Sequence, residues 1–120
     1  MPRIAFLGTG IMGAPMACRL AASGVEVVAW NRTAGKTAAL VPQGVRTAPT
    51  PSEAMHGADA VVVMLANAAA IDAVLFSSDA AGRVPADVLA AGALVVVTSS
   101  EPVEAARAQA AKLAARGVRC

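Results

Sequence analysis

The chain has 120 residues, a formal net charge of +2, and a composition that is 57% apolar and 15% charged. This length leaves room for one domain with one core, since domains usually contain about 100–150 residues. The apolar share exceeds the about 45–50% typical of soluble domains, which indicates strands that are buried on both faces. The small net charge and the scattered basic residues argue against a nucleic acid as a partner.

Three further features of the chain exclude other classes of protein. No apolar run approaches the roughly 18 residues that a membrane-spanning helix needs, so no membrane partner is expected. The first residues lead directly into a strand-like run without the pattern of a signal peptide, which predicts a cytoplasmic location. Cys18 and Cys120 lack the spacing of a metal or redox motif, so we predict reduced thiols and no metal site.

Short apolar runs rich in β-branched residues alternate with helical patterns along the chain. We predict strands at residues 4–7, 25–30, 45–47, 60–65 and 94–98. The predicted helices cover residues 11–22, 34–40, 52–56, 68–75 and 103–116. Neighbouring parallel strands need a crossover, which is normally a right-handed helix. This alternation therefore predicts an α/β fold, a doubly wound parallel sheet with helices on both faces.

Two details concern the first and last predicted helices. In the first, Met12, Met16 and Leu20 follow a spacing of four residues, which predicts that they form its buried stripe. After the last, residues 117–120 resemble a helix end followed by the opening of a sixth strand. We therefore expect a domain over residues 1–120 that is incomplete at its C-terminal edge.

A glycine motif follows the first predicted strand and opens the first predicted helix. Gly8, Gly10 and Gly13, with Ile11 and Met12 between the last two, match the G-x-G-x-x-G pattern of Rossmann-type dinucleotide-binding domains. The glycines permit a tight turn, close approach to a pyrophosphate and close packing of helix on strand. The free N–H groups at the helix start favour an anion. The alternative interpretation is that the glycines serve only the turn.

The residues after the second predicted strand indicate which dinucleotide is preferred. Binding domains of this type usually carry a carboxylate there for the adenosine ribose, whereas this chain has Asn31, Arg32 and Thr33, with Lys36 shortly after. A guanidinium pairs well with a 2′-phosphate. We therefore predict NADP as the cofactor, with NAD possible. In the alternative interpretation, Arg32 and Lys36 are ordinary solvated charges.

Residues 6–17, residues 30–33 and Lys36 resemble the β-hydroxyacid dehydrogenases, the family of 3-hydroxyisobutyrate dehydrogenase and 6-phosphogluconate dehydrogenase. The resemblance covers essentially the whole chain. It implies that Met64 and Leu65 line the cofactor and that Ser99 lies near the nicotinamide, although Val97 replaces the family's aspartate and Ala66 its common proline. Ser99 could equally serve the turn before the last helix.

The same resemblance implies an enzyme of which this chain is one part. The family's catalytic lysine lies on a helix of an all-α second domain, so no residue of this chain is assigned a catalytic role and the chain alone is expected to be inactive. The implied activity is hydride transfer between NADPH and a small β-hydroxy acid or semialdehyde, in a homo-oligomer formed through the second domain. Imine reductases are a second resemblance, on residues 31–33 and 97–102. A third alternative is a non-catalytic NADP-binding module.

Overall fold

The computed structural model describes residues 3–8, 13–32, 41–65, 67–78, 84–89, 91–97 and 102–119. Its centre is a five-stranded sheet in the order β3-β2-β1-β4-β5, in which every pairing is parallel. The strands are β1 (Arg3–Leu7), β2 (Glu26–Trp30), β3 (Arg46–Thr47), β4 (Ala60–Val63) and β5 (Leu94–Val97). This is the strand order of a Rossmann-type doubly wound sheet, and it confirms the predicted fold class.

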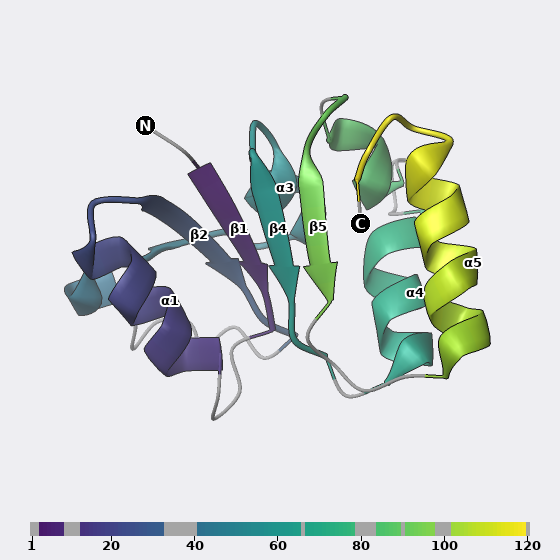
Figure 1. Cartoon of the computed structure of the whole chain (residues 1–120). Coiled ribbons are helices and arrows are strands. Elements are labelled where there is room, and N and C mark those ends of the chain that lie inside the picture. The colour runs from purple at the N-terminus through teal and green to yellow at the C-terminus, as the bar shows by residue number, and fades with distance from the viewer. Residues whose placement is uncertain are drawn as a thin grey trace.

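Helices follow the strands in the predicted alternation (Figure 1). They are α1 (Gly13–Ala22), α3 (Pro51–Met55), α4 (Ala68–Phe76) and α5 (Val103–Ala114), with 3₁₀ turns η1 (Val41–Gln43) and η2 (Pro85–Val88). Both 3₁₀ turns were missed, because three or four residues show no helical periodicity. The helix predicted at residues 34–40 lies outside the described part of the chain.

The two faces of the sheet carry separate apolar clusters, because successive strand residues point to opposite faces. The larger cluster joins α3, α4, α5 and η2 to the sheet and includes Leu7, Val63 and Val95. The smaller cluster joins α1 to Phe6, Val27 and Ala29. Figure 1 shows the corresponding layers, with α1 on one side of the sheet and α4 beside α5 on the other.

Helix α1 faces the sheet with a surface that differs in part from the predicted one. Met16 is 41% exposed, whereas its neighbour Ala17 is fully buried, so the prediction that Met16 is buried is wrong. Leu20, which was also predicted to be buried, does pack against the smaller cluster, together with Ala21, and Met12 lies outside the described residues. A difference of one residue rotates the buried face by about 100°. Small side chains at the contact, Ala17 and Ala21, allow the helix to lie close to the strands.

The last described residue extends the sheet beyond β5. Arg119 forms an isolated parallel bridge with Leu94, in which its N–H donates to the Ala93 carbonyl at 2.8 Å and its carbonyl accepts from the Val95 N–H at 2.8 Å. The bridge lies where the sequence predicts a sixth strand. No helix within the described ranges has the length and apolar character needed to cross a membrane.

Candidate cofactor site

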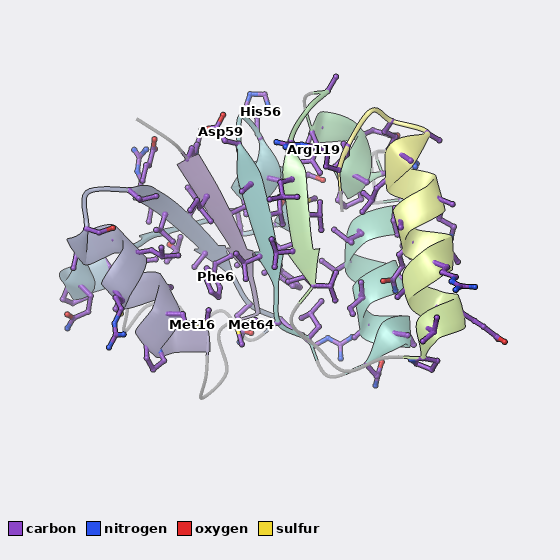
Figure 2. The ribbon with its side chains drawn as sticks, in the orientation of Figure 1. Phe6, Met16, His56, Asp59, Met64 and Arg119 are labelled. Carbon is purple, nitrogen blue, oxygen red and sulfur yellow. The ribbon has the colours of Figure 1, made fainter. Side chains whose placement is uncertain are left out.

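The segments that follow β1, β2 and β4 meet at one edge of the sheet. The three strands are neighbours and parallel, so their carboxyl ends lie together, at the arrowheads in Figure 1. The chain order reverses between β1 and β4, and ligands of open α/β sheets bind at such a switch point, outside the carboxyl ends of the strands. Figure 2 shows Met64 at this edge, with His56, Asp59 and Arg119 at the opposite one.

Gly8 follows β1 directly and lies between β2 and the segment that follows β4. Its N–H donates to the Trp30 carbonyl of β2 at 2.8 Å. Its φ of +91° is one that glycine adopts readily. A Cβ added at this position would overlap the Met64 carbonyl oxygen and would lie 3.0 Å from Leu65 Cδ2. The backbone therefore requires glycine here with or without a ligand, so Gly8 alone does not distinguish between the two interpretations of the motif.

Helix α1 begins at Gly13, five residues after Gly8, so its N-terminal end lies at the same edge of the sheet. The first N–H groups of a helix have no partner within the helix, and together with the helix dipole they favour an anion. Gly10, Ile11 and Met12, which we predicted to line the pyrophosphate, lie outside the described residues.

Asn31 and Arg32 follow β2 at this edge. Arg32 is exposed, and Asn31 is half-buried. Neither Asp nor Glu occurs in the described segments directly after β1, β2 and β4, which are Gly8, residues 31–32 and residues 64–65. A 2′-phosphate at this edge would therefore meet a guanidinium and no adjacent carboxylate. Thr33 and Lys36 lie outside the described residues.

Met64 and Leu65 lie in the turn from β4 to α4. The predicted strand was two residues too long, because β4 ends at Val63, although the Met64 N–H still donates to the Leu7 carbonyl at 2.9 Å. Both side chains are half-buried. Asn67 then begins α4, and its Oδ1 accepts from the Ala70 N–H at 2.9 Å. Ser99 lies beyond the end of β5 and outside the described residues.

Sequence reasoning missed the part that Trp30 plays in this arrangement. It assigned Trp30 to packing, and the side chain does pack against the larger cluster. The backbone carbonyl, however, is the acceptor that holds Gly8. The parallel register of β1 and β2 pairs Leu7 with Trp30. It thereby brings the N–H of Gly8, the residue after Leu7, to the Trp30 carbonyl.

The opposite edge of the sheet holds a network of charged groups. Arg46 Nη1 donates to Glu26 Oε1 at 2.7 Å, and Arg3 Nε lies 3.7 Å from the same oxygen. Asp59 Oδ2 accepts from the backbone N–H of Arg3 at 2.8 Å. The carboxylates of Glu26 and Asp59 are therefore satisfied at the amino ends of β1 and β2, away from Arg32.

Comparison with known proteins gives matches over the whole of this fold. A family model for the NAD binding domain of 6-phosphogluconate dehydrogenase matches residues 3–120. The chain is 44% identical over 64 residues to glyoxylate/succinic semialdehyde reductase 2 of Arabidopsis thaliana, covering 53% of this chain and 18% of that protein.

Two solved structures superpose closely on this chain. The 3-hydroxyisobutyrate dehydrogenase of Mycobacterium tuberculosis is 30% identical with a TM-score of 0.81, over 99% of this chain and 38% of that one. A reductive aminase from Aspergillus terreus, in complex with NADPH and ethyl levulinate, is 30% identical with a TM-score of 0.82, over 99% of this chain and 39% of that one. The chain thus spans less than half the length of each of these relatives.

Proposed function

The chain belongs to the family of the NAD binding domain of 6-phosphogluconate dehydrogenase, and we propose that it binds NADP in preference to NAD. Membership of this family supports a nicotinamide dinucleotide as the cofactor. The observation that carries the preference for NADP is Arg32, which is exposed directly after β2, where a carboxylate would otherwise select the unphosphorylated ribose. The reductive aminase from Aspergillus terreus, which was solved with NADPH, supports the same preference.

The described residues fit such a dinucleotide in two places. The start of α1 would hold the pyrophosphate through backbone N–H groups, and Gly8, which carries no side chain, would let the pyrophosphate come close to the backbone. Arg32 would pair with the 2′-phosphate in a charge-assisted, bidentate manner, with Asn31, Thr33 and Lys36 beside it in the sequence. Met64 and Leu65 would form the wall of the site on the β4 side, and Ser99 would lie toward the nicotinamide.

The reaction we propose for the whole protein is hydride transfer between NADPH and a small β-hydroxy acid or semialdehyde. The nicotinamide supplies the hydride chemistry when it is bound, and this chain binds and orients it. The Arabidopsis relative, whose name describes a reductase of glyoxylate and succinic semialdehyde, supports this substrate class. The two lysines of the chain are Lys36, assigned to the adenosine side, and Lys112 on α5, and we assign neither a catalytic role.

An imine reductase or reductive aminase is the second candidate, because the Aspergillus terreus reductive aminase superposes on this chain as closely as the Mycobacterium tuberculosis 3-hydroxyisobutyrate dehydrogenase does. Oxidation of NADPH by the full-length protein distinguishes the two activities. Turnover of succinic semialdehyde alone supports the first, whereas turnover of a ketone only with an added amine supports the second. Turnover with neither would favour a non-catalytic NADP-binding module.

Calorimetric titration with NADPH and NADH tests the cofactor preference. Replacement of Arg32 by alanine removes a charge-assisted pair worth about 1.5–3 kcal/mol, so we expect NADPH binding to weaken at least about tenfold and NADH binding to stay within about twofold. Arg107→Ala, at an exposed position on α5, is the matched control and should change neither. Equal weakening of both cofactors in Arg32→Ala would contradict the assignment of Arg32 to the 2′-phosphate.

A further inference from the structure

The contact between Gly8 and the turn after β4 joins two segments that are distant in the sequence. The three heavy atoms closest to a Cβ at position 8 all belong to Met64 and Leu65. The Met64 N–H also donates to the Leu7 carbonyl at 2.9 Å. The last peptide of β1 is therefore hydrogen-bonded to Met64, and the Leu65 side chain covers the Cβ position of Gly8, with Cδ2 3.0 Å from it.

The Leu65 side chain is also anchored in the core. It is half-buried and packs against the larger apolar cluster, which includes Leu7, Val63 and Ile71. A leucine held by a core moves little, because protein interiors are close-packed. It forms a fixed wall against the first residue of the glycine motif, while the Trp30 carbonyl fixes the N–H of the same residue from the β2 side.

We propose that Leu65 is a positioning residue whose side chain holds Gly8, and with it the start of the phosphate loop, in the conformation that receives the pyrophosphate. This proposal rests on the proposed binding of NADP for its functional consequence. Its structural consequence is independent of any ligand. Without the Leu65 side chain, Gly8 gains space and its hydrogen bond to Trp30 opens more often.

Amide hydrogen exchange in the ligand-free protein tests the structural part. We compare Leu65→Ala with Leu89→Ala, which removes the same atoms from a leucine that is 6% exposed in the same cluster. The quantity measured is the exchange rate of the Gly8 amide relative to that of Phe6 in the middle of β1, because a loss of global stability alone raises the rate at Phe6 at least as much and cannot raise this ratio. We expect the ratio to rise about tenfold in Leu65→Ala and not to rise in Leu89→Ala.

Two further variants make this comparison decisive. Leu65→Met has a similar volume and should restore the exchange ratio of the unmodified protein. If Leu65→Ala does not fold, Leu65→Val provides a smaller truncation and should raise the ratio in the same direction. Equal ratios in the Leu65 and Leu89 variants would overturn the proposal, whatever the protein binds.

Two ligands test whether Leu65 affects the binding of the pyrophosphate. NADPH carries both a pyrophosphate and a 2′-phosphate, whereas adenosine 2′-monophosphate carries only the latter. We expect Leu65→Ala to weaken NADPH about tenfold and to leave adenosine 2′-monophosphate within about twofold, with Leu65→Met restoring both. Equal weakening of the two ligands would contradict a role at the pyrophosphate. If the unmodified protein binds neither ligand, the proposed function fails, and the exchange ratios still decide whether Leu65 holds Gly8.

Discussion

Position 8 carries two separate requirements for glycine, one from its own backbone and one from its neighbours. The φ of +91° is unfavourable for any residue with a Cβ. The Met64 carbonyl occupies the space that the Cβ would need. Gly92 has the same φ of +91° but nothing within 4 Å of its Cβ position. A comparison of the two positions therefore separates the effect of the backbone angle from the effect of the neighbouring atoms.

Alanine at these two positions should therefore destabilise the protein by different amounts. Gly92→Ala adds backbone strain alone, and we expect the free energy of unfolding to fall by about 1–2 kcal/mol. Gly8→Ala adds an overlap with backbone atoms that cannot rotate away, so we expect a further loss of about 1–3 kcal/mol. Urea unfolding of the ligand-free variants measures both values. Equal losses in Gly8→Ala and Gly92→Ala would show that the overlap with the Met64 carbonyl does not lower the stability.

Single residues also show how far the sequence alone could predict the site. Arg32 was predictable, because a strand end and the absence of a carboxylate are both properties of the sequence. The approach of Leu65 to the Cβ position of Gly8 was not predictable, because it joins residues 57 positions apart and depends on the order of β1 and β4 in the sheet. Spacing within a motif says nothing about a neighbour that arrives from another strand.

Among the elements, α4 has a clear local signal for where it begins. Asn67 has extended backbone angles, and its side chain accepts from the Ala70 N–H at 2.9 Å, as expected of an N-cap residue. By contrast, α5 follows Pro102, which provides no side-chain cap. The start of α4 thus depends on one side chain.

Replacement of Asn67 by alanine should lower the free energy of unfolding by about 1 kcal/mol, because one N–H at the start of α4 loses its partner. Asn67→Asp keeps an acceptor oxygen and adds a charge that the helix dipole favours, so we expect its stability to equal that of the unmodified protein. Thermal unfolding of the ligand-free variants measures the difference. Equal melting temperatures for the alanine and aspartate variants would contradict the assigned capping role.

The errors of the sequence prediction also lie at the level of elements. The predicted strand at residues 60–65 includes Met64 and Leu65 because the apolar run continues, whereas the strand ends where pairing with β1 and β5 ends at Val63. The buried face of α1 was misplaced because methionines gave a stronger apolar signal than Ala17 and Ala21. Apolar character predicted which segments form elements, and packing decided where they end and which way they face.

For the whole molecule, the common direction of the strands determines at which edge of the sheet the site lies. All five strands run in one direction, so one edge gathers Gly8, Arg32 and Leu65, and the other gathers Asp59, Glu26 and Arg119. The strand–helix alternation predicted this arrangement. The sequence could not predict the side-chain network of Arg3, Glu26 and Arg46 at the amino edge, because charged residues at a sheet edge follow no periodic pattern.

Amide NMR spectra recorded during a titration with NADPH test most directly whether the carboxyl edge of this sheet binds NADP. We predict that the amides of Gly8, Asn31, Arg32 and Leu65 shift progressively with NADPH, and that those of Asp59, Gly92 and Arg119 at the opposite edge do not. A larger shift at the opposite edge, or no shift at any of these amides with millimolar NADPH, would contradict the proposed binding at the carboxyl edge.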